Sequence, residues 1–209
     1  AMTTNTAGGE KNVAVGNYAL DALTSGDINT AVGYGALSQN TTGTKNTGVG
    51  YNALESVTTG DFNTAIGQSS GSETTTADGN TSVGQESLRT NVTGANNTAV
   101  GAEALYASTG NANVGVGYQA GKANTSGQII AIGYQTMQSN TTGTRNIAIG
   151  GNAYDSSDTE NDNLAIGHNA MTANTAGGTK NVAIGNYSLD VLTSGDDNVA
   201  VGYISLSAN

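Results

Sequence analysis

The phrase Asn29-Thr30-Ala31-Val32-Gly33 decides the fold, because versions of it recur twelve times along the chain. The copy before it reads Asn12-Val13-Ala14-Val15-Gly16, and the copy after it reads Asn46-Thr47-Gly48-Val49-Gly50. The glycines that end the phrases stand 17 residues apart, with three intervals that differ by one residue. A period this constant leaves no room for helices or inserted loops and is typical of stacked solenoid coils. The sequence therefore predicts an all-β fold, a parallel β-solenoid (a β-roll or β-helix) of about twelve 17-residue coils.

The fourth position of the phrase is β-branched in every copy. A β-branched residue favours a strand, and neighbouring strand residues face opposite ways. The third position is always Ala, Gly or Ser, so the two columns are expected on opposite faces of one strand. We expect the wide column to be the structural core and to pack against the Leu residues that follow each phrase. Its members are Val15, Val32, Val49, Ile66, Val83, Val100, Val116, Ile132, Ile149, Ile166, Ile184 and Val201.

The first position is Asn in eleven of twelve copies, with Ile129 as the exception. Stacked coils bring equivalent residues about 4.8 Å apart, close enough for a ladder of amide hydrogen bonds. The alternative is that each Asn only starts a strand after a turn. After the phrase glycine, a small residue and usually Leu follow, as in Ala36-Leu37, and predict a second, weaker extended segment. A Thr-Thr-Gly or Thr-Ser-Gly turn then closes each coil.

Composition narrows the function classes. The 209 residues include 31 Gly and no Pro or Cys, and only 36% are hydrophobic. The net charge of −10 and the few scattered basic residues argue against a nucleic-acid surface. No apolar run approaches the roughly 20 residues of a membrane span, so no membrane insertion is expected. We expect residues 1–209 to form a single β-solenoid repeat domain, an excerpt of a longer fibre.

Few residues suggest chemistry. His168 is the only histidine, and without Cys or a second His it predicts an exposed structural residue rather than a metal ligand. The acidic turn with Asp155, Asp158, Glu160 and Asp162 could hold Ca²⁺, although a solvated loop is the favoured interpretation. No catalytic arrangement, cofactor or metal site is predicted, so the chain is not expected to be an enzyme. Candidate glycan-stacking residues follow five phrase glycines, and the alternative for them is burial at a subunit interface: Tyr34, Tyr51, Tyr118, Tyr134 and Tyr203.

The thin core suggests that the chain does not act alone. The second phrase position is Thr in coils two to six and apolar from coil seven onward, for example Thr47 against Ile147. A long apolar stripe is more than a monomer usually exposes. We therefore expect a parallel homotrimer, with the apolar half of the second column contributing most to assembly.

The phrases NTAVG, NTAIG and NVAIG, each followed by Ala-Leu or Ser-Leu, resemble the repeats of phage tail-fibre and tailspike proteins. They are also similar to the shorter coils in YadA-like head domains of trimeric autotransporter adhesins, which form parallel β-rolls. The resemblance implies an extracellular, trimeric structural or adhesive protein, on a virion tail fibre or a bacterial surface. It implies attachment to a host-cell glycan or protein and supplies no catalytic residues. A third and remote alternative is an ice-binding β-solenoid.

Overall fold

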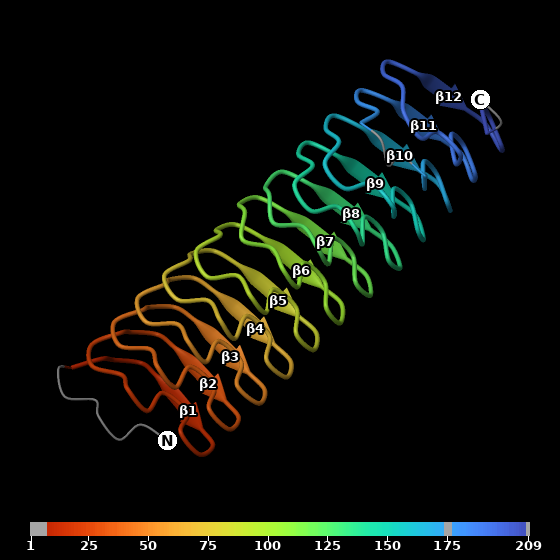
Figure 1. Cartoon of the computed structure of the whole chain (residues 1–209). Coiled ribbons are helices and arrows are strands. Elements are labelled where there is room, and N and C mark those ends of the chain that lie inside the picture. Colours follow the sequence, from red (N-terminus) through yellow and green to blue (C-terminus); the bar gives the residue numbers. More distant parts are fainter. Residues whose placement is uncertain (1–7, 174–176, 208–209) are drawn as a thin grey trace. The chain divides into compact units, whose positions relative to one another are not determined.

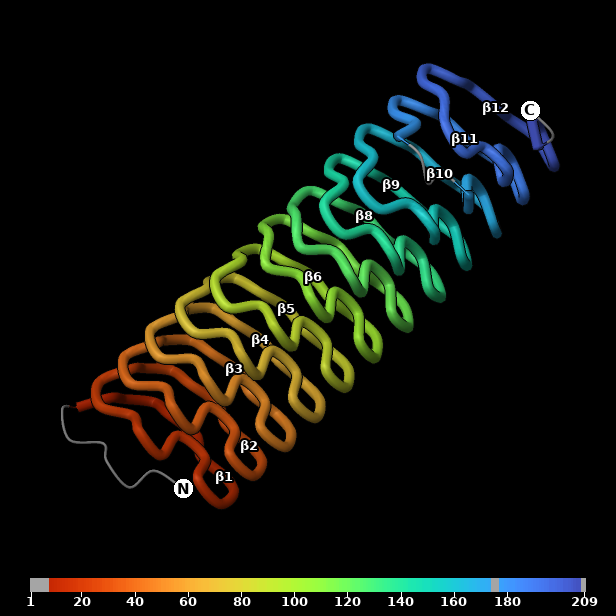
Figure 2. Tube along the Cα trace, in the orientation of Figure 1, coloured from red at the N-terminus to blue at the C-terminus, as the bar shows by residue number. Residues whose placement is uncertain are grey.

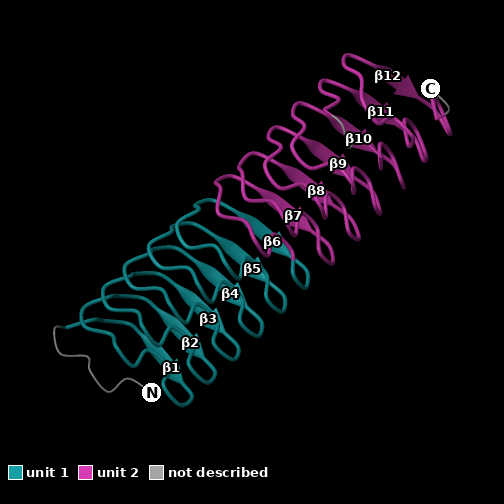
Figure 3. Cartoon of the chain, viewed as in Figure 1, with its two compact units in different colours: residues 1–103 teal, residues 104–209 magenta. Residues whose placement is uncertain are grey.

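The chain is an all-β parallel β-solenoid, as the repeat predicts, and the computed structural model describes residues 8–173 and 177–207. Two compact units, residues 1–103 and 104–209, are distinguished in Figure 3. In each unit the strands follow chain order (Figure 1). Unit 1 contains β1 (Val13–Val15), β2 (Thr30–Val32), β3 (Thr47–Val49), β4 (Thr64–Ile66), β5 (Thr81–Val83) and β6 (Thr98–Val100). Unit 2 contains β7 (Val114–Val116), β8 (Ile130–Ile132), β9 (Ile147–Ile149), β10 (Leu164–Ile166), β11 (Val182–Ile184) and β12 (Val199–Val201).

Successive strands pair in register, so that each phrase position forms a column. In unit 1, Ala31 pairs with Gly48, and Ala65 pairs with Ser82. In unit 2, Ala131 pairs with Ala148. Each coil passes once through a strand and returns through turns to the next level, as the trace in Figure 2 shows. Because the register repeats within each unit, residues at the same phrase position in successive coils lie in the same environment, which explains why each column keeps one type of residue.

The expectation that the Val/Ile column forms the core is wrong. The buried strand residues are instead those of the small third column, including Ala65 and Ala148, which are fully buried. Ile66 remains 43% exposed and Ile149 37% exposed. None of the twelve residues at the fourth position is buried: Val15, Val32, Val49, Ile66, Val83, Val100, Val116, Ile132, Ile149, Ile166, Ile184 and Val201. The second and fourth positions both face outward, and we call their side chains the outer sheet face.

The width of the coil explains why the small column points inward. The Leu residue after each phrase lies directly beneath the strand: a Cβ added to Gly48 would lie 3.3 Å from Leu37 Cγ. A Cβ on Gly115 would lie only 2.7 Å from Leu105 Cγ. An interior this narrow accepts Gly, Ala or Ser on the strand but cannot hold a β-branched side chain as well as Leu. The small column and the Leu column therefore form the centre of the core, which further buried residues such as Leu23 and Val57 extend.

The Leu residues do not lie in a second extended segment, and that expectation is also wrong. They lie in a series of turns, which we call the turn segment, and several adopt left-handed backbone conformations, with φ of 51° at Leu37 and 50° at Leu54. Backbone hydrogen bonds to the next coil hold this conformation, since the Leu54 N–H donates to Ser70 O at 3.0 Å. Both Leu side chains are buried. The left-handed turn thus aims each Leu into the core from the side opposite the strand.

The phrase glycines make the tight bend that the sequence predicts. Gly84 has a φ of 131°, a value that L-residues rarely adopt, and a Cβ there would lie 2.5 Å from Gly101 O of the next coil. Gly50 has a φ of 137° and a similar approach to Gly67. Only glycine allows both the backbone conformation and the close stacking.

The asparagine ladder is confirmed, although most of its bonds join a side chain to the backbone. Asn46 Oδ1 accepts the backbone N–H of Asn63 at 2.9 Å, and Asn46 Nδ2 donates to Gly60 O at 2.7 Å. Direct amide-to-amide bonds also occur, as from Asn63 Nδ2 to Asn46 Oδ1 at 3.2 Å. Each buried amide therefore satisfies two backbone groups of the next coil, one at the strand entrance and one in the turn.

Ile129, the exception in the Asn column, faces a second exception. Gly121 replaces the usual Leu, and a Cβ at Gly121 would lie 2.8 Å from Leu105 Cδ2 and 3.1 Å from Ile129 Cδ1. Ile129 is fully buried. The larger residue in one column thus fills the volume that the smaller residue leaves in the other, which keeps the core of unit 2 packed.

Candidate functional site

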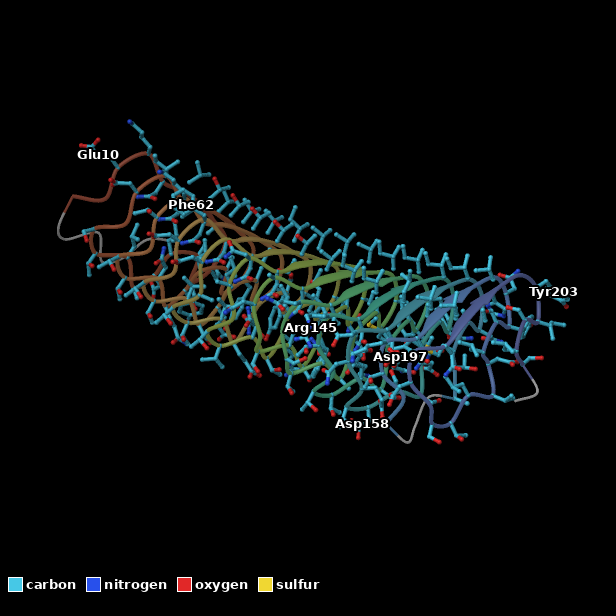
Figure 4. All side chains as sticks on the ribbon, turned by 90° about the horizontal axis from the view of Figure 1, so that it is seen from above. Glu10, Phe62, Arg145, Asp158, Asp197 and Tyr203 are labelled. Atoms are coloured by element: carbon cyan, nitrogen blue, oxygen red, sulfur yellow. The ribbon has the colours of Figure 1, made fainter. Side chains whose placement is uncertain are left out.

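The outer sheet face is the first candidate surface. In unit 2 both of its columns are aliphatic, and at β9 Ile147 and Ile149 are each 37% exposed. In unit 1 the second column is Thr from β2 to β6, so each strand presents one hydroxyl-bearing and one aliphatic side chain. Figure 4 shows side chains standing in regular rows along the ribbon. A flat array of exposed β-branched residues offers apolar surface without charge.

The tyrosines form the second candidate surface. All five candidate glycan-stacking residues are exposed: Tyr34, Tyr51, Tyr118, Tyr134 and Tyr203. Four of them stack in pairs, with ring centroids 5.4 Å apart for Tyr34 and Tyr51 and 5.5 Å apart for Tyr118 and Tyr134. The coil spacing sets these separations, because each tyrosine stands at the same position of its coil.

Two further tyrosines belong to these ladders and escape the sequence analysis. Tyr18 packs edge-on against Tyr34 at 5.4 Å, and Tyr187 packs edge-on against Tyr203 at 6.2 Å. Both stand two residues after the phrase glycine rather than one. A search that allowed one residue of drift in the aromatic position would have found them.

His168 takes the aromatic position of its coil, as expected of an exposed structural residue. Its ring meets Tyr187 edge-on at 5.6 Å, and its backbone N–H donates to Asn186 Oδ1 at 2.8 Å. Across residues 8–173 and 177–207, no group of three or more His, Cys, Asp or Glu side chains lies close enough to hold a metal ion. His168 therefore acts as a member of an aromatic ladder in this fold.

The acidic turn divides into carboxylates with separate surroundings. Glu160 is buried, and its carboxylate accepts the backbone N–H of Asp158 at 2.9 Å. Asp162 is paired with Arg145 through two bonds of 2.6 and 2.8 Å, and the hydrogen bond from Arg145 lowers the pKa of Asp162. Burial raises the pKa of Asp155. Because these groups do not converge on one point, the turn has the character of a structural loop.

A groove of about 380 Å³ opens over the turn segments of the first three coils of unit 1. It joins two tyrosines to polar and acidic side chains, and its lining is Tyr18, Asp21, Tyr34, Gly35, Ser38, Gln39, Asn52 and Glu55. Concave sites that combine aromatic surface with a few polar groups are the usual form of small-ligand sites. This groove brings together more varied chemistry than either column of the outer sheet face.

Comparison with known proteins does not assign the chain to a family, so its class is defined by its fold alone. No protein-family model, no curated protein and no solved structure matches it. Among the described residues, no helix has the length and hydropathy needed to cross a membrane. The fold and its surfaces define a tandem-repeat parallel β-solenoid, with exposed tyrosine ladders and an outer sheet face that is aliphatic in unit 2 and partly Thr in unit 1.

Proposed function

We propose that this chain is a structural and adhesive fibre segment, part of a phage tail fibre that attaches to a host cell, and that it works as a parallel homotrimer. The observation that carries the proposal is the outer sheet face. Its side chains are aliphatic in unit 2 and mostly pair Thr with Val or Ile in unit 1, yet in the single chain they stay half-buried or exposed. No catalytic role is proposed.

Trimer formation would bury this face. A single narrow coil has no room for the Val/Ile column inside, so another surface must cover it if it is to leave water. Cyclic symmetry covers such a face without leaving a sticky edge. In unit 2, pairs such as Ile147 and Ile149 would form an apolar centre with the same residues of two other chains. The number three comes from the resemblance to fibres and adhesins.

The alternative is a head domain of a trimeric surface adhesin on a bacterium. The exposed tyrosine ladders favour a binding role of this kind over a passive spacer, because aromatic side chains are enriched in recognition surfaces. Both versions place the protein outside the cell and share the trimer. Binding of the purified chain to whole bacterial cells, compared with binding to eukaryotic cells, would distinguish the two attachment roles.

Ice binding stays a remote third alternative. A Thr column does face outward in unit 1, from Thr30 to Thr98. The column beside it, however, is Val or Ile rather than a second Thr, and in unit 2 both columns are aliphatic. Thermal hysteresis in a solution of the purified chain would support this alternative over the fibre.

The trimer is tested by mass in solution. Light scattering on the purified chain at micromolar concentration should give three times the 20.7 kDa of one chain. Ile130→Ser and Ile147→Ser should weaken assembly more than the control changes Thr47→Ser and Thr64→Ser, because each Ile change replaces an aliphatic side chain by a hydroxyl, whereas each Thr change removes one methyl and keeps the hydroxyl. A stable monomer would refute the proposed assembly.

A further inference from the structure

The groove in unit 1 lies on a different face of the coil from the outer sheet face. Its residues belong to turn segments, and the Leu residues of these segments pack against the inner side of the strand. Side chains that point away from the core on the turn segment therefore point away from the sheet. Assembly through the outer sheet face would leave the groove open to a ligand.

Gly35 lines the groove at a position where neighbouring coils carry larger residues. At the second position after the phrase glycine, coil one has Tyr18, coil two has Gly35 and coil three has Asn52. The backbone is alike in all three coils, with φ of 60°, 66° and 53° respectively. A Cβ added to Gly35 would collide with Asn52 Oδ1. The absent side chain of Gly35 thus makes room for the side chain of Asn52, and the groove lies beside this close contact.

Two tyrosines form the aromatic side of the groove. Tyr34 stacks face to face on Tyr51, with an interplanar angle of 10°. Tyr18 instead stands at 78° to Tyr34. Tyr18 and Tyr34 are 55% and 47% exposed and both line the groove. Because Tyr18 packs edge-on rather than face to face, both rings keep exposed aromatic surface at the groove.

The polar side of the groove is rich in hydrogen-bond acceptors and carries no cationic side chain. Asp21 and Glu55 contribute carboxylates, and Ser38 and Gln39 contribute a hydroxyl and an amide. Asn52 Oδ1 is buried without a hydrogen-bond partner among the described residues. Because this atom is covered by the protein, the hydrogen-bonding groups that the groove offers to a ligand are those of Asp21, Glu55, Ser38 and Gln39.

We propose that this groove binds a neutral carbohydrate. Sugar hydroxyls would donate to the carboxylates of Asp21 and Glu55, while the apolar face of a pyranose ring would lie on Tyr18 or Tyr34. The two carboxylates disfavour sugars that carry carboxylate, sulfate or phosphate, because like charges repel across a binding site. The inference rests on the proposed attachment function, for which it names the class of receptor.

The test is a glycan array probed with the full chain. Its probes are neutral oligosaccharides of glucose, galactose, mannose and N-acetylglucosamine, together with sialylated versions of the same chains. We expect binding to at least one neutral oligosaccharide and weaker binding to its sialylated form. Absence of binding to every neutral probe at concentrations on the order of 1 mM would overturn the proposal, as would a preference for the sialylated probes.

Matched tyrosine variants locate the site. Tyr18→Ala and Tyr34→Ala should each weaken binding about three- to tenfold, the range expected for one aromatic contact. The control is Phe62→Ala, because Phe62 is an exposed aromatic residue of unit 1 that neither lines the groove nor belongs to a tyrosine ladder. Equal loss of binding in the control would contradict the assignment to the groove.

The same samples separate this inference from the trimer. Light scattering that gives a trimer, together with an array that shows no binding, overturns only the carbohydrate site. A monomer that binds neutral oligosaccharides overturns only the proposed assembly. Circular dichroism of each variant checks that its coils remain folded.

Discussion

The left-handed Leu residues lead to an unusual prediction about glycine. Leu54 is buried and has a φ of 50°, whereas Val57, in the same coil and fully buried, does not have a positive φ. The Val57 N–H donates to Leu54 O at 3.3 Å, so the two residues share one local structure. We compare Ala and Gly variants at each position, because only at Leu54 does glycine relieve a strained backbone.

The magnitudes follow from three contributions. Leu54→Ala should cost about 2–5 kcal/mol of unfolding free energy through lost packing. Going from Ala to Gly removes one more methyl, worth about 0.8 kcal/mol, and adds a backbone entropy cost of about 0.5–1 kcal/mol. At Leu54 the same step releases about 1–2 kcal/mol of left-handed strain. Leu54→Gly and Leu54→Ala should therefore be nearly equal in stability, while Val57→Gly should be about 1.5 kcal/mol less stable than Val57→Ala.

Urea denaturation followed by circular dichroism measures all four variants. The quantity to compare is the Ala-to-Gly difference at Val57 minus the same difference at Leu54, in which the methyl and entropy contributions cancel. We expect about 1–2 kcal/mol. A value near zero would mean that the turn segment does not strain its Leu residues, and it would contradict the left-handed conformation of Leu54.

Three further predictions concern stability. Gly115→Ala should destabilise the protein by about 1–3 kcal/mol, because the added Cβ would press on Leu105. Gly48→Ala should be close to neutral, because the nearest atoms to its Cβ lie at 3.1–3.3 Å. Thermal melts in which the two variants unfold at the same temperature would contradict this prediction. Asn80→Ala should cost about 1–3 kcal/mol by urea denaturation, because it leaves the Asn97 N–H without its partner, whereas Gly94 O keeps its second donor, Asn91 Nδ2; a cost below that of a surface substitution would refute the ladder's importance. Burial raises the pKa of Asp155, so ionisation of this carboxyl lowers the stability of the fold as pH rises through the raised pKa. Asp155→Asn should therefore stabilise the protein near pH 7 but not below the ordinary pKa of a carboxyl group. Thermal melts that show the same effect of the substitution at every pH in this range would count against the prediction.

The sequence by itself determined the solenoid. A constant interval between Gly50, Gly67 and Gly84 requires the same bend in every coil, and the bend needs a residue without a Cβ. The repeated Asn46 position also predicted the asparagine ladder, because identical amides stacked at strand spacing find hydrogen-bond partners in the next coil. Both conclusions depend only on periodicity and local chemistry, which a sequence displays directly.

Only the tertiary structure decided which face of the strand is inside. Alternation of Ala148 and Ile149 shows that the faces differ, and hydrophobicity favours the larger residue for the core. The Leu that reaches across from the turn segment decides this, because it leaves room only for Gly, Ala or Ser on the strand. The left-handed conformation of Leu54 and the close contact of Gly35 with Asn52 also depend on the next coil, and no local propensity predicts them.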